Sequence, residues 1–250
     1  MITLLDISFW LNSVYFLIAI FLAFYIPGVY FISRLKLTKL QEIILSTILG
    51  MVLWGWQGFI FGYLDLRWFS YVYLTLFVSL WFKKNFPFHF KIPKLKDRKV
   101  DLILMIIFAL GIFTQLTAVW FTGILTDKGL FFCCGNIADN ILMISYTKEI
   151  ASNFPPIEPG MFATPIQNYH YWGSIVIGEL IRVFRLPLIP TNFQYMTVFI
   201  SLFLGLSVLA FSQILNLGKV FSRWLILFLY LGGDLIWVLI TIYRRRDFKW

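Results

Sequence analysis

The chain has 250 residues, of which 60% are hydrophobic, 20% aromatic and only 13% charged. Because soluble domains carry about 25% charged residues, this composition excludes an ordinary water-soluble domain. The net charge of +9 does not indicate nucleic-acid binding, since the basic residues stand in short stretches between apolar runs, as membrane topology and anionic lipid headgroups require.

Long uncharged runs predict an all-α, polytopic membrane protein. A helix needs roughly 20 apolar residues to cross a bilayer, and backbone in lipid must satisfy its own hydrogen bonds. The runs of sufficient length are Ile7 to Ser33, Ile43 to Leu64, Leu102 to Thr126 and Leu186 to Gly218. Two further candidates are the shorter Trp68 to Phe82 and Trp224 to Tyr243, which contains Asp234. The first run has no basic residues before it and no cleavage site, so it is expected to be a retained span.

The loops predict the orientation, because cytoplasmic loops are enriched in Lys and Arg. The stretch from Arg34 to Lys39 is basic, and Lys83 to Asp101 holds seven basic residues against two acidic ones. Both are therefore expected inside, which places the N-terminus outside and makes Asp65 to Arg67 a tight outer turn. The next outer segment, Asp127 to Asn168, has a net charge of −2, as this orientation requires.

Two arrangements are open beyond this segment. If Tyr169 to Val183 crosses the membrane, the arginines at 244–246 fall inside, whereas Lys219 and Arg223 fall outside. If Tyr169 to Arg185 lies in the interface instead, Lys219 and Arg223 fall inside and the triple arginine outside. We favour the first arrangement, which gives about seven transmembrane helices and one long outer loop.

The chain is thus expected to have three regions: a four-span N-terminal region (1–126), an outer loop (127–168) and a C-terminal transmembrane region (169–250). The loop is the candidate catalytic region, because it gathers carboxylates, aromatic residues and loop-forming Pro and Gly at one membrane face, with His170 just beyond it.

A short amphipathic helix is predicted within the loop. Ile137, Ile141 and Ile144 recur at i, i+4 and i+7, and Pro155-Pro156 is expected to stop the helix. An amphipathic helix that begins at a membrane face is expected to lie along the interface.

Asp139 falls in the first turn of this predicted helix and has two interpretations. With Asn136 as the N-cap, it complements the helix dipole. Alternatively, Asp139, with Asp127, faces an active cavity as a general base or a metal ligand. Residue chemistry alone favours the structural interpretation.

Among the other polar residues, His170 is a candidate functional residue, whereas the two cysteines have no predicted role. His170 opens the next predicted helix, where it is expected to serve either as an interfacial residue or as a functional one that hydrogen-bonds a phosphate or orients a carboxylate. The adjacent Cys133 and Cys134 suit neither a disulfide staple nor a zinc site.

Two carboxylates fall within apolar segments. Glu179 has Arg182 three residues on, so a local ion pair is expected to accompany its burial. Asp234 has no local partner; it is either a functional intramembrane carboxylate or lies at the outer surface, where Gly232-Gly233 breaks the helix.

The arrangement from Asp127 to Pro187 resembles the GT-C superfamily of integral-membrane glycosyltransferases. The shared features are an early Asp in a long outer loop, a short amphipathic helix, a Pro-rich stretch and the sequence Tyr169-His170-Tyr171 opening the next span. This resemblance implies transfer of a sugar from a polyprenyl-phosphate carrier to an acceptor outside a bacterial or archaeal inner membrane. It also implies that the chain is the N-terminal part of such an enzyme or a reduced relative.

What the resemblance implies for the residues is a single displacement at the sugar's anomeric carbon. Asp139 or Asp127 is expected to take the proton from the acceptor hydroxyl. His170, Lys128 or a divalent cation is expected to stabilise the leaving lipid phosphate. The remaining candidates for substrate binding are Tyr169, Asn140 and Asp234. The expected partners are membrane lipid and the polyprenyl-phosphate sugar.

The alternative is a non-enzymatic membrane protein, either a subunit or a carrier of lipids or solutes. A carrier predicts polar residues along the spans, lining a path. Because the polar residues cluster in the outer loop, we favour the enzyme.

Overall fold

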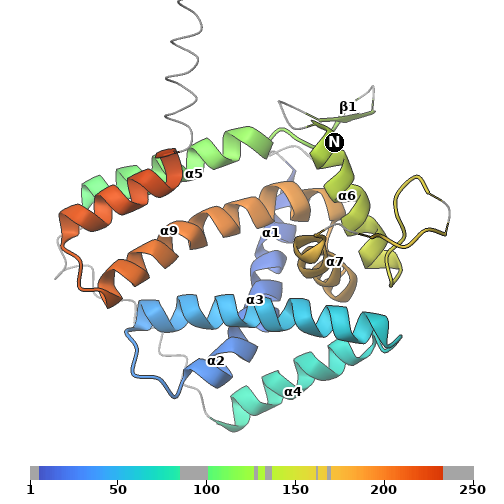
Figure 1. Cartoon of the computed structure of the whole chain (residues 1–250), viewed down its shortest axis with the longest axis horizontal. Coiled ribbons are helices and arrows are strands. Elements are labelled where there is room, and N and C mark those ends of the chain that lie inside the picture. Colours follow the sequence, from blue (N-terminus) through green and yellow to red (C-terminus); the bar gives the residue numbers. More distant parts are fainter. Residues whose placement is uncertain are drawn as a thin grey trace, which may run out of the picture. The chain divides into compact units, whose positions relative to one another are not determined.

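The structure is a computed structural model that describes residues 6–84, 101–126, 129–132, 137–161, 163–167 and 170–232. Most of these residues are helical (Figure 1). The chain forms two compact units. Unit 1 comprises Met1–Phe88 and Val119–Thr197, and unit 2 comprises His89–Ala118 and Val198–Trp250.

The first predicted span is one continuous helix, built from α1 (Ile7–Ile20), the π-helical segment η1 (Phe21–Tyr25) and α2 (Ile26–Ile32). Asp6 caps it, because its carboxylate accepts a hydrogen bond from the Ser8 N–H at 2.9 Å. Pro27 has no N–H to donate and its ring crowds the preceding turn, which accounts for the wider π turn before it.

The second span, α3 (Lys39–Tyr63), starts at a capping box formed by Thr38 and Gln41. It packs antiparallel against η1 and α2, with Gly50 on the Phe24 backbone and Gly28 on the Ser46 backbone. A Cβ on either glycine would overlap that backbone, so only glycine permits the approach.

The third and fourth helices are α4 (Phe69–Lys83) and α5 (Leu102–Val119). The sequence predicted a helix as far as Thr126, and this was wrong beyond Val119. The chain turns at Gly123 (φ 78°), and β1 (Ile124–Thr126) then pairs antiparallel with β2 (Gly129–Phe131). Length and hydropathy alone cannot place such a stop, because the strand is as apolar as the helix before it.

The remaining helices follow in chain order. They are α6 (Ile137–Ser152), α7 (Trp172–Phe184), and a continuous helix made of α8 (Leu188–Pro190), the π-helical η3 (Thr191–Tyr195) and α9 (Met196–Ile214). Residues 219–232 are also helical.

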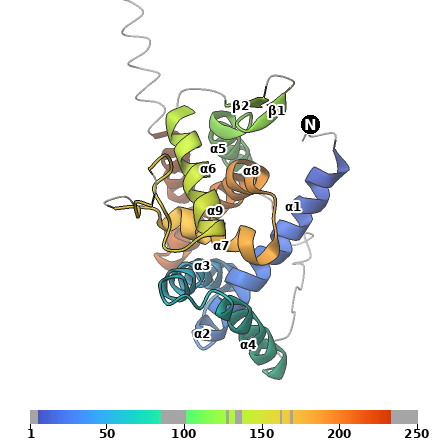
Figure 2. The same ribbon diagram turned by 90° about the vertical axis from the view of Figure 1, so that its right-hand side faces the viewer.

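Helix α7 lies at the centre of unit 1. Every residue from Ser174 to Leu180 is buried, which requires neighbours on all sides. It crosses α3 at Gly55 and Gly58: α3 lies across the page in Figure 1 and is seen nearly end-on in Figure 2, whereas α7 shows the opposite. At 13 residues, α7 is also shorter than a bilayer crossing needs.

Helix α6 confirms the predicted helix before Pro155. Ile141 is exposed, whereas Asn140, Thr147 and Ile150 are buried. Gly178 of α7 receives the Ile150 side chain, so α6 turns this mixed face toward α7. Periodicity counted apolar residues and could not show which face had a partner.

Three helices in the described residues are long and apolar enough to cross a membrane: Ile7–Ile32, Lys39–Tyr63 and Leu188–Ile214. Helices α4 and α5 are apolar but shorter. The described residues therefore form a mostly helical protein with candidate membrane spans, as predicted, and they add one short hairpin that the sequence did not predict.

Unit 2 has its own polar and aromatic contacts. Arg223 donates two hydrogen bonds to the Asp101 carboxylate, at 2.9 and 3.0 Å. The backbone N–H of Leu104 and the Arg223 guanidinium hold the pKa of Asp101 below its usual value. The Tyr230 ring packs on Gly111, and its hydroxyl donates to the Ser201 carbonyl.

Candidate functional site

A buried ion-pair cluster is the most developed polar constellation among the described residues. Glu179 of α7 is 1% exposed, and its carboxylate lies between two guanidinium groups. Arg67 donates to Oε1 at 2.6 Å, Arg182 donates through Nε to both oxygens at 3.1 and 3.2 Å, and the Ser70 hydroxyl donates to Oε2 at 3.3 Å. A carboxylate engaged by this many donors is an anchor rather than a proton acceptor.

The turn after α3 brings Arg67 into this cluster. Asp65 adopts a left-handed conformation (φ 55°), and the chain reverses toward α4. The same Arg67 Nη2 donates to the Ile150 carbonyl of α6 at 2.6 Å. That carbonyl belongs to the last turn of α6, where a cation complements the helix dipole. Arg67 therefore joins the α3–α4 turn to both α6 and α7.

Arg182 makes a second set of links from α7 to the same turn. Its Nη2 donates to the Arg67 carbonyl at 3.0 Å and to the Ser70 hydroxyl at 2.8 Å. Its guanidinium also lies 6.0 Å from the centre of the Tyr71 ring. The predicted i, i+3 pair with Glu179 is confirmed, and it is one half of a larger network.

Gly58 sets the depth at which Glu179 sits. A Cβ at this position would stand 2.6 Å from Glu179 Cγ, closer than side-chain carbons approach each other. The glycine therefore lets α7 cross α3 closely enough for Arg67 and Ser70, from the turn after α3, to meet the carboxylate. The arrangement is a clamp that holds α6, α7 and the α3–α4 turn together.

The predicted base, Asp139, lies in the first turn of α6 and is exposed. Within the described residues, Asp139 makes no hydrogen bond or ion pair, unlike the two other described carboxylates of the predicted outer loop. Glu149 accepts from the Asn153 amide at 3.0 Å, and Glu158 accepts from the Tyr146 hydroxyl at 2.8 Å. The position of Asp139 suits both a residue that complements the helix dipole and an accessible base.

Of the other predicted site residues, the structure describes Asn140 and His170. Asn140 is 6% exposed, and its amide nitrogen has no hydrogen-bond partner among the described residues. His170 is exposed just before α7. Asp127, Lys128, Tyr169 and Asp234 lie outside the described residues, as do Cys133 and Cys134.

No metal site is found in the part of the chain that the structure describes. None of its groups of His, Cys, Asp or Glu brings three such side chains together. The prediction that a divalent cation assists the leaving phosphate therefore remains a prediction.

Sequence reasoning missed Arg67 and Ser70 as partners of Glu179, because both are more than 100 positions from Glu179 in the chain. One signal was present. Arg67 is a basic residue in a turn predicted to lie outside, where the topology rule predicts few, and such a residue is expected to have a specific partner.

Comparison with known proteins identifies no relative: no family model, curated protein or solved structure matches the chain.

Proposed function

We propose that the chain is a multi-pass plasma-membrane protein of the glycosyltransferase type, which moves a sugar from a polyprenyl-phosphate carrier to an acceptor at the outer face. The main support for the proposal is the state of the Asp139 carboxylate. Among the described carboxylates of the outer loop, it alone is exposed and unpaired, whereas Glu149 and Glu158 are hydrogen-bonded. A general base has to reach its substrate's proton, and Asp139 is free to do so.

The order of the elements supports the same proposal. Between α5 and α8 the described chain contains a hairpin, α6 and the buried α7. The clamp at Glu179 fixes α6 and α7 to the turn between α3 and α4. A rigid support of this kind suits a site that has to hold its reacting groups in place.

The topology that we propose differs from the seven spans expected from the sequence. Asp101 is the last residue of the basic loop predicted to lie inside, and its ion pair with Arg223 supports an inside position for Arg223 as well. In that arrangement α7 stays at the outer face, and there are six crossings: α1–α2, α3, α4, α5, α8–α9 and the helix that starts at 219. The short, buried α7 agrees with this choice.

The test is sugar transfer in membranes that contain the full chain. We expect Asp139→Asn to lower the transfer rate about 10²–10⁴-fold, the usual contribution of a general base. Glu149→Gln serves as the matched control on the same helix, because its carboxylate is already hydrogen-bonded, and it should retain activity. Full activity in a variant that carries both Asp139→Asn and Asp127→Asn would rule out a carboxylate base.

A second candidate function, a lipid or solute carrier, is favoured by buried polar groups in the candidate spans. Gln57 in α3 and Asn192 in η3 are each buried, and both amide atoms of each lack a hydrogen-bond partner among the described residues. Polar groups of this kind at membrane depth suit a path for a polar substrate. Gln57→Leu and Asn192→Leu should abolish movement of a labelled lipid across vesicles if the chain is a carrier; under the enzyme proposal, Asp139→Asn is the variant that loses function.

A further inference from the structure

The hairpin β1–β2 and the turn before it pack against the start of the span Leu188–Ile214. The Gln194 amide donates to the carbonyls of Trp120 and Thr122, both at 3.0 Å. Farther along the chain, the ring centres of Phe132 and Phe193 are 6.2 Å apart. Phe193 and Gln194 follow Leu188 by five and six residues, which at about 1.5 Å per residue places them roughly 8 Å along the span.

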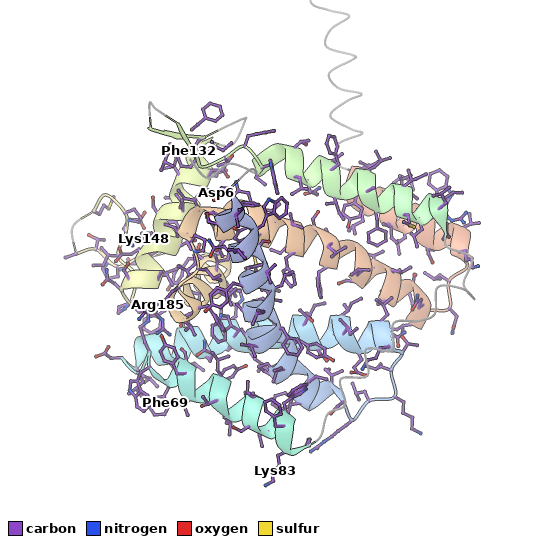
Figure 3. The ribbon with its side chains drawn as sticks, turned by 180° about the vertical axis from the view of Figure 1, so that it is seen from behind. Asp6, Phe69, Lys83, Phe132, Lys148 and Arg185 are labelled. Atoms are coloured by element: carbon purple, nitrogen blue, oxygen red, sulfur yellow. The ribbon has the colours of Figure 1, made fainter. Side chains whose placement is uncertain are left out.

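The same turn also touches the start of the first span. The ring of Phe9, the third residue of Ile7–Ile32, lies 6.2 Å from the ring of Trp120. Figure 3 places Phe132 and Asp6 at the same end of unit 1. Two candidate spans therefore hold the base of the hairpin near the level at which both of them begin.

The surface that the hairpin presents at this level is apolar. Phe121, Leu130 and Phe131 are 52%, 47% and 49% exposed, and the described residues 121–126 and 129–132 include no charged side chain. Because neighbouring strand residues point to opposite sides, the exposure of both Leu130 and Phe131 leaves both faces of β2 uncovered. In water such a two-stranded hairpin is only marginally stable.

We propose that this hairpin is a lipid-binding surface that inserts into the outer leaflet, with Phe121, Leu130 and Phe131 as the inserted side chains. The occupant is bilayer lipid, because the ends of two spans bring that lipid to the same level. The strand edges limit the depth. Their unpaired N–H and C=O groups need water, so the hairpin lies at the boundary between headgroups and acyl chains, where aromatic side chains are favoured.

The proposal rests on the membrane placement of the spans proposed above. The experiment therefore tests the inserted hairpin and the placement of the spans separately. The chain has two cysteines, and Cys133→Ser with Cys134→Ser gives a background for single-site spin labels. Phe131→Cys is the test site, exposed Leu17 within the first span is the lipid control, and exposed Gln167 in the outer loop is the aqueous control. The full chain is reconstituted in phosphatidylglycerol–phosphatidylethanolamine vesicles, and collision rates with oxygen and with a water-soluble nickel chelate are measured.

The label at Phe131→Cys should collide preferentially with oxygen, as the Leu17→Cys label does, and unlike the Gln167→Cys label. A nickel-chelate accessibility equal to that of Gln167→Cys would overturn the inserted hairpin, while the membrane placement would stand on the Leu17→Cys result. Inaccessibility to both reagents would also overturn it, because another protein surface would then cover the hairpin. Preferential nickel-chelate collision at Leu17→Cys would refute the membrane placement itself.

Discussion

Replacement of Glu179 by Gln should be among the most destabilising single changes in unit 1. The variant keeps the shape of the side chain but leaves two guanidiniums, each 16% exposed, facing a neutral amide. Removing one partner of a buried ion pair typically costs about 3–5 kcal/mol, because the remaining charge stays buried without compensation. We expect a value near the lower end, about 3 kcal/mol, since the partial exposure of both arginines admits some water.

The matched control is the ion pair between Lys39 and Glu42, whose Nζ and Oε1 atoms are 2.8 Å apart. Like Glu179 and Arg182, these two residues are three positions apart in the chain. Their side chains are 52% and 25% exposed, so Glu42→Gln should change stability by at most about 1 kcal/mol. The assay is reversible unfolding in mixed micelles, followed by circular dichroism. A Glu179→Gln value within about 1 kcal/mol of the control would refute the clamp. Adding Arg67→Met to the Glu179→Gln variant should restore part of the lost stability, because that change removes one of the uncompensated charges. The absence of any recovery would also refute the clamp.

Two further predictions concern a close helix contact and an ion pair. Gly58→Ala should destabilise unit 1, because its Cβ would press on Glu179 Cγ, whereas Gly173→Ala in α7 meets open space and should be neutral or stabilising in the same unfolding assay. The depressed pKa of Asp101 stabilises the folded state above the unfolded-state pKa of about 4, and this contribution is lost as the pH falls through the lower folded-state value. Asp101→Asn should therefore weaken the acid dependence of hydrogen exchange at the start of α5; an unchanged dependence would show that the pair with Arg223 does not contribute.

Much of the helical architecture could be predicted from the sequence. The observed helices at Ile7–Ile32 and Lys39–Tyr63 differ from the predicted runs by a few residues at their ends. Uncharged length decides such helices, because an apolar backbone has to satisfy its own hydrogen bonds. The helix containing Asp139 and the local pair of Glu179 with Arg182 were also predictable, since both depend on spacings of a few residues along one helix.

Contacts between distant segments were not predictable in this way. Hydropathy could not predict that α7 is a helix of only 13 residues enclosed by other helices, because such a helix is as apolar as a membrane span. Periodicity identified the apolar side of α6, but it could not show that α7 packs against the face that carries Ile150.

The sequence by itself determined that this is a helical chain with long apolar helices, and it identified Asp139 as a carboxylate in the first turn of a helix within the predicted outer loop. Only the tertiary structure decided that Asp139 is exposed and unpaired while Glu179 is enclosed by Arg67 and Arg182. The physical reason is that hydropathy and helix spacing act between near neighbours. The pairing of a buried charge instead depends on which side chains the folded helices bring within a few ångströms of it.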